Sequence, residues 1–161
     1  MNIAVILGAA KEPMQLRLEE ALRRDYDQII IAGTPEEICC LDNQLPDINI
    51  ARYESYSTWG NYVAVCDNTQ PEDELTFIGH ESHTHRMQTY QEYFSDRDIE
   101  NVVLQDPSLK ARYKAFDVFS ATVHRLALKF MPESMKNQTR NRNSCLNRHI
   151  IPLKNKIMNK S

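Results

Sequence analysis

The sequence predicts a three-layer, Rossmann-like α/β fold with a mainly parallel sheet of about five strands. Five short apolar runs occur between residues 3 and 105, and segments with helical periodicity separate them. Three of these runs end at a glycine, namely Gly8, Gly33 and Gly79. Strands that alternate with helical segments of about 10–15 residues indicate βαβ units, whose right-handed crossovers place helices on both faces of a parallel sheet.

The first part of the chain supplies three strands and two helices. Residues 3–8 are apolar and end at glycine, which predicts a buried strand. Residues 16–24 alternate apolar and charged side chains at helical spacing after a proline, and proline is a helix-start signal. Residues 29–33 repeat the strand pattern. Pro35 and the two acids after it open the next helix, since the first helical turn favours both residue types. Residues 48–53 form the third strand.

The alternation continues to residue 130. Residues 59–66 predict a third helix, residues 75–79 a fourth strand, residues 83–94 a fourth helix and residues 101–105 a fifth strand. A long helix follows over residues 108–130. Its apolar residues recur at three- or four-residue spacing, so we expect this stripe to pack on the sheet. The stripe comprises Phe116, Phe119, Val123, Leu126, Ala127 and Phe130.

Length and composition predict one α/β domain over residues 1–132 and a basic C-terminal tail over residues 133–161. The chain has 161 residues and a net charge of −3, within the size of about 100–200 residues that is usual for one domain. The tail carries seven Lys or Arg residues and one acid, so its charge is +6 and that of the remainder is −9. We expect the Asn-rich tail to be poorly ordered. A basic tail of this kind can contact nucleic acid or anionic lipid, but it is more often a solvated, charge-balancing end, so no nucleic-acid partner is expected except through the tail.

The sequence also predicts a cytoplasmic protein with no membrane span. The apolar start of the chain is too short for a signal peptide and lacks a basic leader. No window approaches the roughly 18 uninterrupted apolar residues of a membrane-spanning helix.

Polar clusters follow the ends of the predicted strands. In an open parallel sheet, ligands bind outside the carboxyl ends of the strands, so we expect these clusters to share one edge and form the candidate site. The clusters are GAAK from Gly8, GT from Gly33, ESYSTWGN from Glu54, GHESHTHR from Gly79 and QD from Gln105.

The residue types in these clusters indicate recognition of an anion. Gly8 allows a ligand to approach the backbone, and the N–H groups of the next helix can bind a phosphate or carboxylate. Ser55 and Thr58 carry hydroxyls that can bond a ligand. Arg86 supplies a planar guanidinium for bidentate contact with an anion. His83 titrates near neutrality and is a candidate acid or base.

The same residues also have structural interpretations. Ser57 or Thr58 can serve simply as the N-cap of the helix that follows. Asn61 can tie the backbone of the loop instead of contacting a ligand. Arg17 can be a surface charge paired with a nearby glutamate such as Glu20.

The order of the motifs resembles the DUF218 family of YdcF/SanA/ElyC-like proteins over roughly residues 2–105. The pattern S-x-x-T-x-x-N begins at Ser55, and H-x-x-R follows at His83, after a strand. The family's arginine-containing first helix is matched at Arg17. Its Ser-Gly-Gly turn after the second strand corresponds to the Ala-Gly-Thr around Gly33.

This chain departs from the family pattern at two positions near the first motif. Gly60 stands where a glutamate is common, and Arg52 stands where an acid is usual, so Glu54 matches that acid only if the loop is shifted.

The resemblance implies a small anionic or nucleotide-like ligand at the strand-end edge, with S-adenosylmethionine as a candidate cofactor and no specified reaction. The residues and the resemblance together give one candidate site. Its ligand-binding residues are Gly8, Arg17, Gly33, Glu54, Ser55, Thr58, Asn61 and Arg86, and its candidate catalytic residue is His83.

Two alternatives remain open. Residues 80–85, HESHTH, hold three imidazoles and a carboxylate, which suit a divalent metal and predict a metal-assisted phosphoester hydrolase using His80, His83 and His85. Their spacing is not His-Glu-x-x-His, and a helix that begins at His83 would point His83 and His85 apart, so we assign no metal ligand. The second alternative is a non-enzymatic interaction module whose basic tail recruits a partner.

Overall fold

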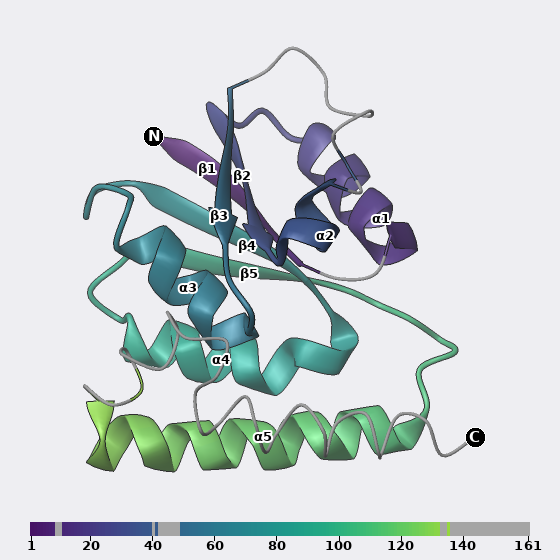
Figure 1. Ribbon diagram of the computed structural model, residues 1–161, viewed down its shortest axis with the longest axis vertical. Coiled ribbons are helices and arrows are strands. Elements are labelled where there is room, and N and C mark those ends of the chain that lie inside the picture. Colours follow the sequence, from purple (N-terminus) through teal and green to yellow (C-terminus); the bar gives the residue numbers. More distant parts are fainter. Residues whose placement is uncertain (9–10, 40, 42–48, 133–134, 136–161) are drawn as a thin grey trace.

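The computed structural model describes residues 1–8, 11–39, 41, 49–132 and 135 of the chain (Figure 1). Their strands form one five-stranded sheet, and every neighbouring pair is parallel. The strands are β1 (Asn2–Leu7), β2 (Gln28–Gly33), β3 (Ile50–Glu54), β4 (Glu74–His80) and β5 (Ile99–Leu104). Their order in the sheet is β3-β2-β1-β4-β5, so the predicted Rossmann-like α/β fold is confirmed.

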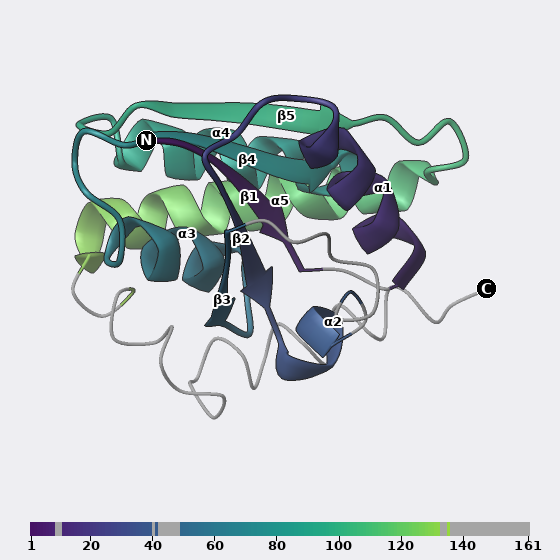
Figure 2. The ribbon, with the colours of Figure 1, turned by 90° about the horizontal axis from the view of Figure 1, so that it is seen from above.

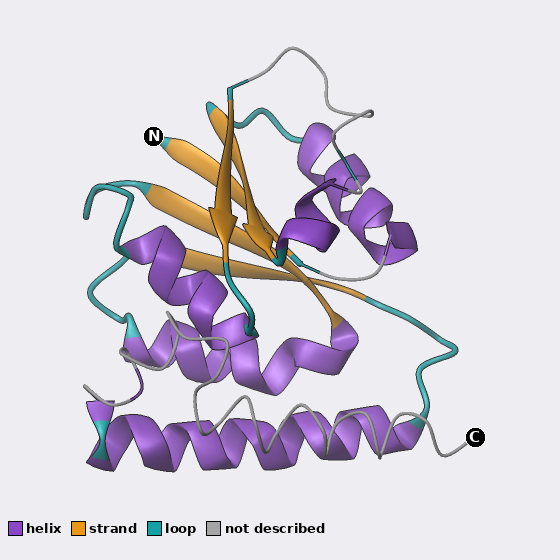
Figure 3. Ribbon diagram, viewed as in Figure 1, coloured by secondary structure: helices purple, strands orange, loops and turns teal. Residues whose placement is uncertain are grey.

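Helices cover both faces of the sheet (Figures 2 and 3). The helices α1 (Lys11–Leu22) and α2 (Pro35–Cys39) pack on the face that includes Ala4 and Ile6. The helices α3 (Thr58–Cys66) and α4 (Thr84–Tyr93) pack on the opposite face with Ile3, Val5 and Leu7. Successive side chains of a strand point to opposite faces, so β1 contributes to both cores and is almost wholly apolar.

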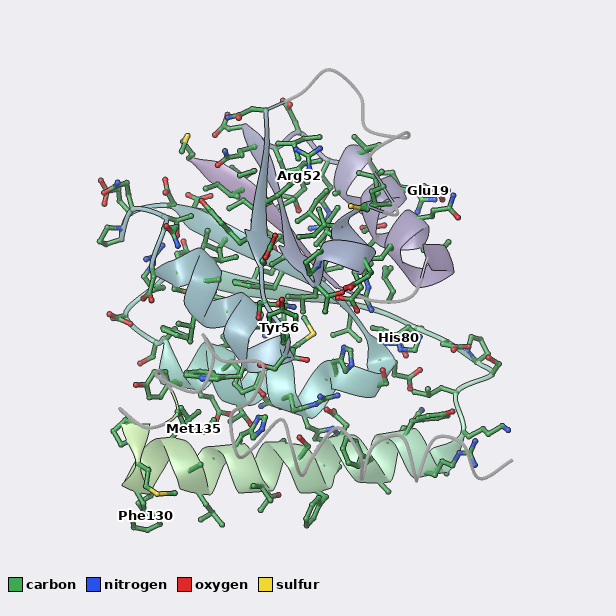
Figure 4. All side chains as sticks on the ribbon, viewed as in Figure 1. Glu19, Arg52, Tyr56, His80, Phe130 and Met135 are labelled. Carbon is green, nitrogen blue, oxygen red and sulfur yellow. The ribbon has the colours of Figure 1, made fainter. Side chains whose placement is uncertain are left out.

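The last described helix, α5 (Ala111–Phe130), packs against α4 and the short 3₁₀ helix η1 (Glu81–His83). The prediction that its apolar stripe packs on the sheet is wrong, because Phe119, Leu126 and Phe130 are 59%, 53% and 70% exposed. Phe130 points away from the body of the molecule (Figure 4). The buried residues of α5 are Asp117, Ser120, Ala121, His124, Ala127 and Leu128.

The body extends past the end of α5 to Met135. This side chain is 2% exposed and belongs to the core that surrounds Trp59. The indole Nε1 of Trp59 donates a hydrogen bond of 3.0 Å to the Met135 carbonyl. The rest of the predicted tail, residues 136–161, lies outside the described residues. The alternative that this tail recruits a partner protein therefore also concerns residues that the structure does not describe. Within the described chain, no helix is long and apolar enough to cross a membrane.

Candidate functional site

The carboxyl ends of the strands meet at one edge, where the predicted polar clusters follow them. The backbone N–H of Gly8 donates to the Ala32 carbonyl at 2.6 Å, and that of Ser55 donates to the Gly33 carbonyl at 2.8 Å. The ends of β1, β2 and β3 are therefore hydrogen-bonded in a row, and β4 ends on the other side of β1. Tyr56 marks this edge after β3 in Figure 4.

A carboxylate that sequence reasoning missed, that of Glu37, lies against the ends of β1 and β2. Its Oε2 accepts a 2.8 Å hydrogen bond from the Thr34 N–H. A Cβ added to Gly33 would lie 2.8 Å from this oxygen and 2.9 Å from the Gly8 Cα, and a Cβ on Gly8 would overlap the same oxygen. No described glycine has a positive φ. Gly8 and Gly33 are therefore required because the two strand ends and the Glu37 carboxylate lie too close together to admit a Cβ. The space beside Gly8 that was predicted to admit a ligand holds Glu37.

Arg17, predicted to bind ligand, is 1% exposed beneath the end of β1. Its Nη1 donates to the carbonyls of Leu7 and Gly8. Its Nε has no hydrogen-bond partner in the described part of the chain. Burial lowers the pKa of Arg17 to about 10, and the attraction of Glu37 opposes that effect. The alternative that Arg17 is a surface charge is wrong.

The start of α3 is built around Ser55 and Ser57. Ser57 is the N-cap, and its Oγ accepts a 3.0 Å bond from the Gly60 N–H. Ser55 is 3% exposed and donates from Oγ to the Ser57 carbonyl at 3.2 Å. A Cβ on Gly60 would overlap the Ser55 Oγ, so the position of this hydroxyl requires glycine here. Thr58 is half-buried at the first position of the helix.

Two further residues of the predicted site lie beside this helix start. Asn61 is 5% exposed, and its Oδ1 has no hydrogen-bond partner in the described chain. Glu54 is exposed at the end of β3. Together with Ser55 and Arg52 it lines a hollow of about 270 Å³ between β3 and α3. The hollow lies beside the edge strand of the sheet, away from β4.

The start of α4 holds the other predicted residues, His83 and Arg86. His83 is the N-cap residue of α4. Arg86 is 9% exposed, and it donates from Nε to Asp117 Oδ1 at 2.7 Å and from Nη2 to the Ser82 carbonyl at 3.0 Å. Asp117 is fully buried, and its Oδ2 accepts a 2.7 Å bond from the His85 N–H. Sequence reasoning missed Asp117, whose only signal was an acid inside a long helical segment.

The three imidazoles of the HESHTH segment do not form one site. His80 Nδ1 accepts the Ser82 N–H at 3.2 Å, and its Nε2 lies 3.4 Å from Asp106 Oδ2. His85 instead faces Asp117, at 3.2 Å from Nδ1 to Oδ2. Among the described residues, no three His, Cys, Asp or Glu side chains are grouped to hold a metal ion. The metal-assisted hydrolase therefore gains no support from this geometry.

A second polar pair joins α4 to α5. The Tyr90 hydroxyl and the His124 Nδ1 are hydrogen-bonded in the buried interface, where His124 is 6% exposed. Burial and, to a smaller extent, the positive charge of Arg86 together lower the pKa of His124 to about 4.

Acid should destabilise the fold through His124. The unfolded chain takes up the imidazole proton near pH 6.5, whereas the folded protein resists it until about pH 4. The stabilisation is therefore complete above pH 6.5, and up to roughly 3 kcal/mol is lost as the pH falls to 4. Urea unfolding between pH 7 and pH 4 measures this loss. His124→Gln should show a shallower pH dependence than the wild type, and equal slopes would contradict the assignment.

Comparisons with known proteins identify no similar protein. No protein-family model matches the chain, and no curated protein or solved structure is significantly similar to it.

Proposed function

We propose that the protein binds a small anionic, nucleotide-like ligand at the carboxyl edge of the sheet, between the first turns of α3 and α4. The observation that supports this most is the state of Arg86. Two of its nitrogens are fixed by Asp117 and Ser82, and its third nitrogen, Nη1, makes no hydrogen bond to another described residue. A guanidinium held in this way loses little side-chain freedom when it receives an anion.

The start of α3 supports the same proposal. This nine-residue helix directs the positive end of its dipole toward the edge, where negative groups are stabilised. Thr58 supplies a hydroxyl in its first turn. The Asn61 Oδ1 is buried without a partner in the described chain, and as an acceptor it can take a hydrogen bond from an N–H or hydroxyl of a nucleotide-like ligand. S-adenosylmethionine remains a candidate through the resemblance to the DUF218 family. His83 is the candidate acid or base, and we propose no reaction for it.

Ligand binding should raise thermal stability in a way that depends on Arg86. At a concentration of about 100 times Kd, a ligand adds about 2.7 kcal/mol, or roughly 5–10 °C in Tm for a chain of this size. The panel is inorganic phosphate, ribose 5-phosphate, AMP and S-adenosylmethionine. Arg86→Lys should weaken binding by at least about tenfold, because a point charge cannot replace the planar fork.

Arg97→Lys is the matched control. Arg97 also donates to carbonyls, with 3.0 Å to Cys66, but it precedes β5 at the opposite edge of the sheet. Binding by this variant should equal that of the wild type. Binding that survives Arg86→Lys but disappears with EDTA would contradict the proposal and restore the metal-dependent alternative.

A further inference from the structure

Glu37 is held rigidly at the strand-end edge by a reciprocal pair of hydrogen bonds with Thr34. The Thr34 N–H donates to Glu37 Oε2 at 2.8 Å, and the Glu37 N–H donates to Thr34 Oγ1 at 3.3 Å. This is a capping box at the start of α2. A capping box alone uses one carboxylate oxygen. The other oxygen, Oε1, has no hydrogen-bond partner among the described residues, and the side chain is half-buried.

The surroundings of this carboxylate go beyond what a helix cap needs. It lies against the Cα atoms of both Gly8 and Gly33, where any larger residue would displace it. Behind the same strand ends lies the guanidinium of Arg17, which is 1% exposed and has no carboxylate within 4.0 Å in the described chain. The positive charge of Arg17 attracts the Glu37 carboxylate at longer range. The ends of β1 and β2 therefore present a fixed negative group.

A fixed carboxylate repels an anion and accepts hydrogen bonds from hydroxyl groups. The anionic part of a ligand is consequently excluded from the ends of β1 and β2 and left to α3 and α4. Adjacent strands lie about 4.8 Å apart, so the ends of β2 and β4 are separated by roughly 10 Å across β1. That span suits a sugar phosphate better than a lone phosphate ion.

We infer that Glu37 is a specificity-determining residue that accepts hydrogen bonds from the sugar hydroxyls of a phosphorylated sugar or nucleotide, through Oε1. The sugar lies over the ends of β1 and β2, and the phosphate lies toward Arg86. This inference rests on the proposed function and assigns a ligand class and an orientation to the same site.

Calorimetric titration of ribose 5-phosphate and inorganic phosphate into the full chain tests the assignment. The wild type should bind ribose 5-phosphate at least about tenfold more tightly than inorganic phosphate, since a hydrogen bond to a charged group contributes this much. Glu37→Gln should reduce that preference to about threefold or less. It should leave the affinity for inorganic phosphate equal or higher, because a repulsive charge is removed.

Glu36→Gln is the control, because it removes the same charge from the neighbouring, exposed position of α2. It should retain the preference for ribose 5-phosphate. The midpoint of thermal unfolding without ligand shows whether Glu37→Gln remains folded, and Glu37→Asp is the second variant if it does not. Its shorter side chain retains the charge and should still lose the preference.

The possible results distinguish failure of this inference from failure of the proposed function. The role of Glu37 is overturned if the wild type binds both compounds equally. It is also overturned if Glu37→Gln weakens the binding of both by the same factor. Either result leaves the proposed function, binding of an anionic ligand, standing. Failure of the wild type to bind either compound overturns the proposed function and this inference with it.

Discussion

Asp117→Ala should lower the free energy of unfolding by about 3–5 kcal/mol, because it leaves the charge of Arg86 buried without its partner. Asp117 is fully buried, and Arg86 donates to it from Nε at 2.7 Å. The substitution also removes the acceptor of the His85 N–H. Urea unfolding monitored by circular dichroism measures the loss, and the Trp59 fluorescence gives a second probe of the same transition.

A surface ion pair between the same two helices provides the comparison. Arg125 on α5 and Glu92 on α4 lie 2.9 Å apart, but both side chains are more than half exposed. Glu92→Ala should cost about 1 kcal/mol or less, because solvent screens exposed pairs. Similar losses for the two variants would mean that burial of the Arg86–Asp117 pair does not govern its contribution.

Two C-terminal truncations that differ by only four residues should differ strongly in stability. Removal of residues 134–161 takes away Met135, which is 2% exposed in the core, and the carbonyl that accepts the Trp59 Nε1–H. We expect a loss of about 2–5 kcal/mol, the usual cost of deleting a buried methionine side chain. Removal of residues 138–161 keeps both contacts and should therefore cost less stability than the longer truncation.

Denaturant unfolding of the two truncated proteins and the full chain measures the difference. Met135→Ala in the full chain separates the side chain from the carbonyl, since it retains the hydrogen bond to Trp59. Equal stability of both truncated forms would show that Met135 adds nothing to the core.

The strands could be predicted from sequence because each is recognisable from its own residues. The central strands β1 and β2 are buried on both faces and almost uniformly apolar, and all five observed strands begin and end within two residues of their predicted positions. The shared edge followed from the parallel arrangement alone. The sequence therefore predicted that the polar clusters after the strands lie at this edge, but not which side chains within them make contact.

The packing of α5 could not be predicted, because periodicity identifies two faces of a helix without saying which partner each face meets. The polar face carries Asp117 and His124, and it is buried because Arg86 and Tyr90 of α4 satisfy those groups. No pattern within residues 108–130 contains that information. An apolar stripe that includes Phe130 consequently remains on the outside.

The position of the Glu37 carboxylate could not be predicted from sequence for a related reason. The pattern T-x-x-E from Thr34 is a recognisable capping box. Its location against Gly8 depends on β1 and β2 pairing in one register, in which Leu7 lies beside Ala32. Local sequence can indicate the cap, but only the assembled sheet brings that carboxylate to the end of β1.

The strand order also has a consequence for the growing chain during synthesis. β1 lies at the centre of the sheet, and its second neighbour, β4, pairs Asn2 with Glu74. A ribosome releases β1, β2 and β3 before β4, which begins only at Glu74, so until then the nascent sheet can pair on one side of β1 only. The other side of β1 then exposes unpaired backbone groups next to an apolar strand, which is a site for mispairing with another chain. Pairing with β4 closes that edge, so a strand that is synthesised later protects β1.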